Sequence, residues 1–256
     1  MGDLTGTSGA DIDAPEAWDV ETGSEDVVIA IVDTGVDYTH PDLADNIWVN
    51  DDEISGNDID DDSNGYIDDV NGYDLADNDS DPLDRMDHGT HCAGIAAAVG
   101  NNEIGIAGVS WNCKIMPVKV FTDEGRTPVY LWSEGIKYAA DNGADVLSMS
   151  IGGHGMADVL QDGIDYAYGK GCVLVAAAGN DGGSRSLYPA FFDNVISVAA
   201  INQNNGRCTK QDWDPDNHYP LIQGSTWGDE VDVAAPGNLV YSTMPTYHVL
   251  GNDDYN

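Results

Sequence analysis

A run of apolar, mostly β-branched residues at 27–32 constrains the fold more than any other feature, because it ends directly in a carboxylate, Asp33. A continuous apolar run of this length is typical of a strand that is buried in a parallel sheet. A second such run, at 173–178, is followed by Gly179 and Asn180. Open α/β sheets place their functional sites at the carboxyl ends of such strands. The sequence therefore predicts a doubly wound, mainly parallel sheet flanked by helices.

A histidine lies at the start of a third feature, residues 87–94, which read Asp-His-Gly-Thr-His-Cys-Ala-Gly. The small apolar residues that continue this stretch to Val99 favour a helix, because alanine loses little entropy on helix formation. His88 is therefore expected in the first helical turn. An Asp, a His and an Asn at the ends of buried elements suit acyl transfer. In that reaction Asp33 would orient the imidazole, His88 would act as base, and Asn180 would stabilise an oxyanion.

Further elements follow in regular alternation, and no repeat or interdomain linker interrupts them. The whole chain, residues 1–256, is therefore expected to be a single domain. Apolar patterning predicts strands at 114–120, 146–150, 195–200 and 231–234, and helices at 14–18, 129–141 and 157–170. Residues 202–221 are rich in Asn and Asp and are predicted to be a polar insertion.

These motifs, taken together and in this order, resemble those of the subtilisin-like serine proteases, the subtilases. The matching segments are Asp33-Thr34-Gly35, His88-Gly89-Thr90-His91, Ser150-Ile151-Gly152-Gly153, Ala176-Ala177-Ala178-Gly179-Asn180 and Ala234-Ala235-Pro236-Gly237. The resemblance implies an endopeptidase with protein or peptide substrates, in which Ser150, Ile151 and Gly152 lie beside the bound substrate. It also implies a secreted enzyme whose precursor carries an inhibitory pro-segment.

The nucleophile of that family is missing from the sequence. Family members place their serine in a Gly-Thr-Ser-Met-Ala segment after the Ala-Pro-Gly strand, and no such segment occurs here. Ser225 is rejected as a substitute because it precedes that strand. The chain is therefore expected to be an incomplete, amino-terminal portion of a peptidase domain that is inactive alone. Two alternatives stay open: a non-catalytic calcium-binding protein on the same scaffold, and a serine supplied by a separate polypeptide.

The resemblance also implies a strong calcium site. Its carboxylate ligands would be Asp3 and Asp42, and its partner loop would be residues 100–106. There Asn102 would offer its side-chain oxygen, and Gly100, Ile104 and Ile106 would offer their carbonyl groups. This donor set is chemically sound, since Ca²⁺ takes six to eight hard oxygens and accepts backbone carbonyls readily.

A second calcium site is predicted in the most acidic stretch, residues 51–81. From Asp60 onward the sequence matches the first half of a calcium loop, with oxygens at the first, third and fifth positions, glycine at the sixth and Asp at the ninth. Asn71 occupies the twelfth position, where an EF-hand has Glu, so this is a different kind of loop. A disordered acidic run is the alternative. The predicted ligands are Asp58, Asp60, Asp62, Asn64 and Asp68; the later carboxylates Asp74, Asp77, Asp79, Asp81 and Asp84 are not assigned.

Net charge limits the classes of binding partner, and the cysteine content limits the disulfide bonds that can form. The net charge of −37, from 46 acidic and 9 basic residues, makes nucleic-acid binding improbable because phosphates would be repelled. No apolar run is long enough to predict a membrane span. Such acidity suits a solvated surface at high salt as well as calcium binding. Cys92 is expected to be a free thiol near His88, and a disulfide between two of Cys113, Cys172 and Cys208 stays open.

Overall fold

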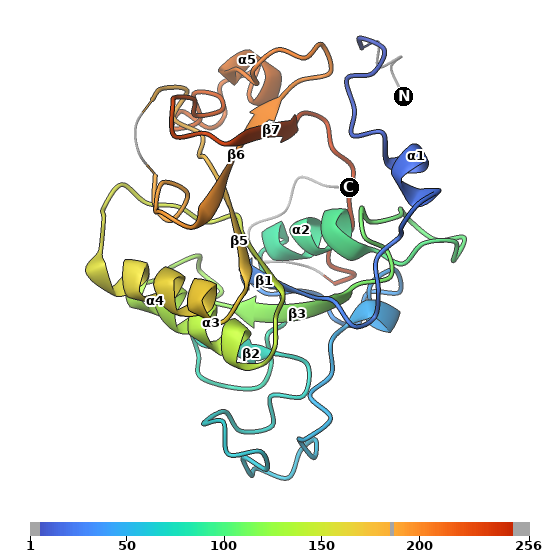
Figure 1. Ribbon diagram of the computed structural model, residues 1–256, viewed down its shortest axis with the longest axis vertical. Helices are drawn as coiled ribbons and strands as arrows, with labels where there is room; N and C mark the ends of the chain where they lie inside the picture. Colours follow the sequence, from blue (N-terminus) through green and yellow to red (C-terminus); the bar gives the residue numbers. More distant parts are fainter. Residues whose placement is uncertain (1–5, 185–186, 248–256) are drawn as a thin grey trace. The chain divides into compact units, whose positions relative to one another are not determined.

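The computed structural model describes residues 6–184 and 187–247 (Figure 1). The chain divides into two compact units, which are described separately. The larger unit comprises Thr22–Ser150, Ala157–Leu174 and the segment from Tyr241 onward. The smaller unit comprises the segment up to Glu21, then Ile151–Met156 and Val175–Val240.

The larger unit is built on a parallel sheet with the strand order β2-β3-β1-β4. Its strands are β1 (Val28–Asp33), β2 (Tyr73–Asp74), β3 (Lys114–Lys119) and β4 (Val146–Met149). In the register of the sheet, Asp33 pairs with Lys119 and Ile31 pairs with Ser148. The central strand β1 is almost entirely buried, which is the physical reason for its continuous apolar run.

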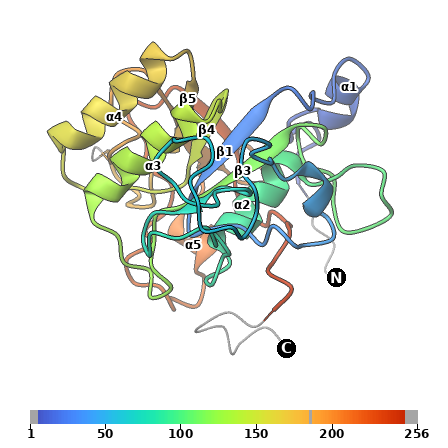
Figure 2. The same cartoon turned by 90° about the horizontal axis from the view of Figure 1, so that it is seen from below.

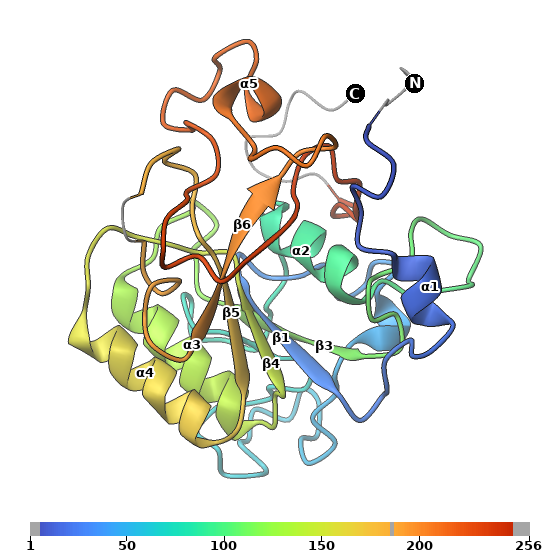
Figure 3. The same cartoon turned by 45° about the horizontal axis from the view of Figure 1, so that its top comes forward.

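Helices cover both faces of this sheet, as Figures 2 and 3 show. One face carries α2 (His88–Ala97), and the other carries α3 (Val129–Asp141) and α4 (Asp158–Gly169). A short 3₁₀ helix, η1, spans Ala44–Asn46. Small residues let the helices pack closely against the sheet. For example, a Cβ atom on Gly135 of α3 would lie 2.7 Å from a methyl group of Val120, the residue after β3. The core beneath α2 contains Ile31, Val36, Leu43, Ile47, Ala93, Ala97, Ala98, Cys113 and Ile115.

The smaller unit contains β6 (Val195–Ile201) and β7 (Val233–Pro236), which pair in parallel. Strand β5 (Val173–Ala177) runs into this unit from Leu174, and the amide of Ala178 just after it donates to the carbonyl of Val198 at 2.9 Å. Two short helices, α1 (Ala14–Trp18) and α5 (Lys210–Trp213), complete the unit.

The predicted α/β class with a mainly parallel sheet is confirmed, and the predicted helices and long strands lie within about two residues of their expected bounds. Sequence patterning missed three short elements, β2, η1 and α5. Helix α5 lies inside the predicted polar insertion and begins with a capping box between Thr209 and Asp212, which a reading based on apolar periodicity does not detect.

The four cysteines all lie within the described residues and are free thiols, so the disulfide that the sequence left open does not form. Cys113, Cys172 and Cys208 are buried, and the Cys172 thiol donates to the carbonyl of Ala144 at 3.1 Å. For Cys113 and Cys172, which precede β3 and β5, this burial agrees with the packing role expected at the starts of strands. Within the described ranges, every helix is too short or too polar to cross a bilayer.

Candidate active site

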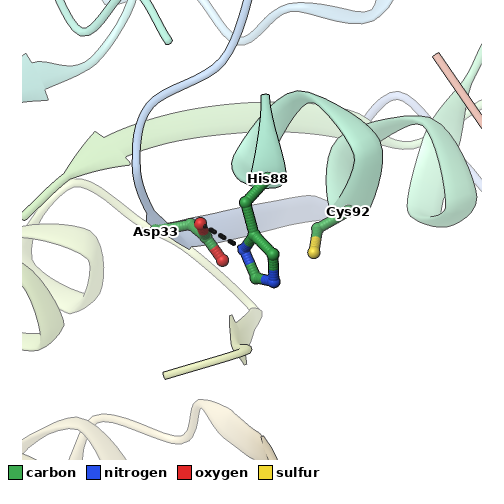
Figure 4. A group of neighbouring side chains, drawn as sticks. All are labelled: Asp33, His88 and Cys92. Carbon is green, nitrogen blue, oxygen red and sulfur yellow. Dashed lines mark hydrogen bonds and ion pairs between the residues drawn. The ribbon is translucent and has the colours of Figure 1, made fainter. Parts of the chain in front are cut away.

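The carboxyl end of β1 and the amino end of α2 bring two side chains together in the larger unit. His88 Nδ1 lies 2.7 Å from Asp33 Oδ1 (Figure 4). The Asp33 side chain is 1% exposed, whereas that of His88 is 53% exposed. The carboxylate is therefore held inside the protein while the imidazole faces outward. The predicted association of Asp33 with His88 is thus present in the structure.

Two glycines allow the strand and the helix to meet. Gly35 follows β1 with φ of +107°, a left-handed conformation that side chains other than glycine rarely adopt. A Cβ atom on Gly89 would lie 2.0 Å from the carbonyl oxygen of Gly35. Any larger residue at position 89 would therefore push α2 away from β1 and separate His88 from Asp33.

Hydrogen bonds to neighbouring groups hold the Asp33 carboxylate in place. Its Oδ1 atom accepts a second hydrogen bond, 2.7 Å long, from the backbone amide of Thr34. Its Oδ2 atom is buried and accepts no hydrogen bond within the described part of the chain. A buried carboxylate in this position favours the imidazole tautomer that carries its proton on Nδ1, which leaves Nε2 of His88 as the basic nitrogen.

The electrostatics of the pair follow from this geometry. The hydrogen bond and the negative charge of Asp33 raise the pKa of His88 to about 9. Cys92 lies one helical turn further along α2, and its thiol donates to Ser150 Oγ at 3.5 Å. Burial, followed by the charge of Asp33, raises the pKa of Cys92 to about 12, so this thiol is protonated and unreactive at neutral pH.

Asp33, His88 and Cys92 each offer one donor atom, and these atoms lie within 4.8 Å of one another. A metal bound there would need the Cys92 thiolate, which its raised pKa disfavours. The arrangement is better suited to proton transfer at His88 than to metal binding.

Asp84 joins the start of α2 to the end of β1, a role that no sequence pattern predicted. The side chain is fully buried, and its two oxygens accept five hydrogen bonds of 2.8–3.0 Å. The donors are the hydroxyl groups of Thr34 and Thr90 and the backbone amides of Met86, Asp87 and Thr90. Asp84 thereby ties the first turn of α2 to the end of β1. It is buried inside the protein, whereas the surrounding acidic sequence suggested only a solvated or calcium-binding surface.

The remaining predicted site residues are divided between the two units. Ser150 belongs to the larger unit, and Ile151, Gly152 and Asn180 belong to the smaller one. Asn180 is exposed and follows β5, and its carbonyl accepts the amide of Gln223 at 2.8 Å.

The first predicted calcium site contains a fully buried carboxylate, Asp42. Its oxygens accept Asn102 Nδ2 at 2.7 Å and the amide of Ile106 at 2.9 Å. Gly105 packs so closely that a Cβ atom there would lie 2.1 Å from Asp42 Oδ2. Asp3 lies outside the described residues. His40 has a structural role, since its Nδ1 accepts the amide of Asp42 at 3.0 Å.

The acidic loop has a defined conformation held by side chain to backbone hydrogen bonds. Carboxylate oxygens of Asp60, Asp62 and Glu53 lie within 4.8 Å of one another. Glu53 was not predicted, because it precedes the calcium-loop pattern in sequence. It folds back onto the loop, where it accepts the amides of residues 61, 62 and 68 at 2.8–3.1 Å.

The other predicted loop residues make hydrogen bonds within the loop. Asp68 accepts the amides of Asn57 and Asp58 at 2.9–3.1 Å, and the Asn64 amide group donates to Asp62 and Asp69. Asp69, buried beneath the loop, also accepts the Tyr138 hydroxyl at 2.8 Å. The structure therefore gathers the carboxylates of Asp60 and Asp62 with that of Glu53, and those of Asp58 and Asp68 lie outside this group. Asn64 contacts the group, since its backbone amide donates to Asp60 and Asp62 at 2.9–3.0 Å.

Comparison with known proteins places this geometry in context. The sequence profile of the Subtilase family matches residues 24–255. Thermitase from Thermoactinomyces vulgaris is 43% identical over 235 residues, which cover 92% of this chain and 71% of thermitase. The halolysin-like extracellular serine protease Nep of Natrialba magadii is 35% identical over 231 residues, covering 89% of this chain and 37% of Nep.

A solved structure of proteases from Pseudoalteromonas arctica matches with a TM-score of 0.71 and 32% identity, covering 90% of this chain and 68% of that one. The family profile spans β1 and α2, which supply the paired carboxylate and imidazole. With its mainly parallel α/β fold, the chain belongs to the subtilase family of subtilisin-like serine proteases.

Proposed function

We propose that this chain supplies the acid–base half of a serine endopeptidase. The observation that carries the proposal is the 2.7 Å contact between the buried Asp33 carboxylate and the exposed His88 imidazole. A buried carboxylate that orients an outward-facing histidine suits proton transfer to and from a reactant outside the fold. Membership of the subtilase family makes peptide-bond hydrolysis the reaction that this pair serves.

In the complete enzyme, His88 takes the proton from a serine hydroxyl as that oxygen attacks the peptide carbonyl. His88 then returns the proton to the leaving amine, while Asp33 stabilises the imidazolium that forms between these steps. Asn180 donates from its side-chain amide to the oxyanion, an interaction on the order of 3 kcal/mol. Ser150, Ile151 and Gly152 pair with the extended substrate backbone.

The serine itself is proposed to come from residues that follow Asn256 in the complete protease, in a Gly-Thr-Ser-Met-Ala segment. The greater length of the relatives supports this assignment, since the chain covers 71% of thermitase and 37% of Nep. Residues 1–256 alone are then expected to hydrolyse no peptide at a measurable rate. The name of Nep, an extracellular protease, supports secretion, and a precursor of this kind would carry an inhibitory pro-segment.

Calcium is proposed as the structural cofactor. The chemistry of the donor sets fits this ion, because carboxylate and amide oxygens are the ligands that Ca²⁺ prefers. Within the larger unit, one site would use Asp42 and Asn102 with the carbonyls of Gly100, Ile104 and Ile106. The other would use Glu53, Asp60 and Asp62, with Asp58, Asn64 and Asp68 as further candidates. Bound calcium would neutralise part of the local charge and hold these loops against the sheet.

The test of function compares three proteins in a casein and fluorogenic-peptide assay. They are the natural uninterrupted reading frame that contains these residues, its His88→Ala variant, and residues 1–256 alone. We expect activity from the first, a loss of about 10⁶-fold in the second, and none from the third.

An in-frame stop codon directly after Asn256, together with calcium binding by the unextended chain, would instead support the non-catalytic calcium-binding alternative. If a smaller polypeptide copurifies and restores hydrolysis, the serine is supplied in trans. Retention of activity in the His88→Ala variant would refute the proposed mechanism.

A further inference from the structure

Residues 242–247, the strap, lie along α2 within the larger unit. The hydroxyl group of Ser242 donates to the carbonyl of His91 at 2.6 Å, and that of Thr243 donates to the carbonyl of Thr90 at 2.7 Å. Both acceptors belong to the first turn of the helix. The strap is therefore seated directly on the backbone of α2.

A glycine in α2 makes room for the strap. A Cβ atom on Gly94 would lie 2.3 Å from Thr243 Oγ1 and 2.5 Å from Ser242 Oγ. Thr243 is accordingly buried, with 5% of its surface exposed. Any side chain at position 94 would lift the strap off the helix, so the close contact depends on this glycine.

A buried carboxylate holds the strap further along. The backbone amide and the hydroxyl group of Thr246 both donate to Asp37 Oδ2, at 2.9 and 2.8 Å. Asp37 is fully buried. Burial acts to raise the pKa of Asp37, but hydrogen bonds from Thr246 and Thr39 outweigh it and lower that pKa, so the carboxylate is charged at neutral pH. Charged acceptors form the stronger hydrogen bonds, which makes Asp37 a firm anchor.

The order of the contacts gives the strap a direction. From Ser242 to Tyr247, its hydroxyl groups donate to carbonyls that lie progressively earlier in the chain, and the Tyr247 hydroxyl ends at the carbonyl of Asp84 at 2.6 Å, before the helix begins. The guanidinium of Arg85 lies 5.7 Å from the centre of the Tyr247 ring. The strap therefore runs antiparallel to α2, toward the turn that carries His88.

We infer that the strap positions the nucleophile relative to His88, and that Asp37 is a positioning residue for the reaction. This inference rests on the proposed function, in which the serine follows Asn256 and so follows the strap in sequence. A reacting atom misplaced by about 1 Å can cost about 10²-fold in rate. Loss of the anchors should therefore slow attack by the serine without altering the contact between Asp33 and His88.

The test uses the complete reading frame and a double variant, Thr246→Val with Tyr247→Phe. These changes remove only hydroxyl groups from an exposed and a partly exposed side chain, so the fold should persist. We expect kcat to fall by at least about tenfold, with KM and the pH dependence of kcat/KM unchanged because His88 keeps its carboxylate. Tyr241→Phe is the matched control, since Tyr241 next to the strap is 74% exposed.

Asp37→Ala removes the acceptor of both Thr246 hydrogen bonds and should lower kcat in the same direction. It also leaves the amide and hydroxyl group of Thr39 without their acceptor, so it disturbs more than the strap. The double variant is therefore decisive. A lower melting temperature with an unchanged kcat in the double variant would show a merely structural strap and would overturn the inference.

A fluorophosphonate probe separates this inference from the proposed function, because it reacts with an activated serine without any peptide. The serine oxygen bonds to phosphorus and displaces fluoride, while His88 takes the hydroxyl proton. Labelling should slow by at least about tenfold in the double variant and stay unchanged in Tyr241→Phe. If peptides are not hydrolysed but the serine is labelled, and labelling slows in the double variant, the proposed function fails and the positioning role stands. Unchanged labelling in the double variant, an equal loss in Tyr241→Phe, or no labelling of the unsubstituted protein overturns the inference.

Discussion

At the scale of single residues, the contact between Asp33 and His88 sets both a protonation state and a direction of pH dependence. A pKa of about 9 means that the imidazole is mostly charged at neutral pH. Because this folded-state pKa lies above the ordinary value near 6.5, the pair stabilises the fold fully below about pH 6.5. That contribution is lost as the pH rises through about 9.

Catalysis should show the opposite trend, since only neutral imidazole can accept the serine proton. The kcat/KM of the complete protease is expected to rise as the pH increases and to level off near pH 9. A pH profile measured with a neutral peptide substrate, in which the substrate itself does not titrate, checks this. A plateau already reached at pH 6 would contradict the assigned influence of Asp33.

Replacing the carboxylate tests its role directly. Asp33→Asn keeps the size of the side chain but removes its charge and favours the wrong imidazole tautomer, so kcat should fall by about 10⁴-fold. The pKa of His88 should move down toward 6.5. The residual activity should therefore rise with pH over a lower pH range than in the unsubstituted protease. NMR titration of His88 measures the pKa separately from turnover. If the pKa of His88 stays near 9 in this variant, Asp33 is not its cause.

At the scale of elements, the junction of β1 with α2 depends on a single buried carboxylate. Asp84 accepts five hydrogen bonds at this point and orders the first turn of α2, from which His88 projects. A charged acceptor at a helix amino terminus also interacts favourably with the helix dipole. The geometry of the proposed catalytic pair is therefore supported by a residue outside the pair.

Asp84→Ala is expected to lower the free energy of unfolding by about 3 kcal/mol, because several buried donors lose their acceptor together. For a chain of this size that corresponds to a melting point lower by about 10 °C. Asp45→Ala, at an exposed position of the same unit, is the matched control and should change the melting point little. Equal effects of the two substitutions would show that Asp84 is not an anchor.

At the scale of the whole molecule, the excess of carboxylates governs stability. With a net charge of −37, the folded chain repels itself at low ionic strength. The Debye length falls from about 30 Å at 0.01 M salt to about 3 Å at 1 M, so added salt screens this repulsion. The melting temperature should therefore rise between these concentrations of NaCl, in the presence of chelator so that calcium plays no part. A constant or falling melting temperature would argue against self-repulsion.

Calcium should act on specific loops beyond this general screening. Calcium is expected to raise the melting temperature of the chain well above the effect of the same ionic strength of NaCl. Glu53→Ala with Asp60→Ala should remove part of that increase, whereas Asp216→Ala, at an exposed position outside the loop, should not. A melting temperature that excess chelator leaves unchanged would eliminate both proposed calcium sites.

The sequence by itself determined the fold class and pointed to Asp33 and His88 as the pair proposed to be catalytic. Continuous apolar runs rich in β-branched residues favour buried strands, and polar side chains at the carboxyl ends of such strands are placed where α/β sheets carry their sites. Asp33 and His88 were therefore predictable, and so were the main helices, whose apolar periodicity and terminal glycines are local signals.

Only the tertiary structure decided which polar groups meet from distant parts of the chain. Glu53 and Asp84 look like any other acidic residue in sequence, because their partners are amides and hydroxyl groups that folding brings to them. Local patterns record burial and periodicity, whereas hydrogen-bond partners and free volume exist only after separate segments have packed together.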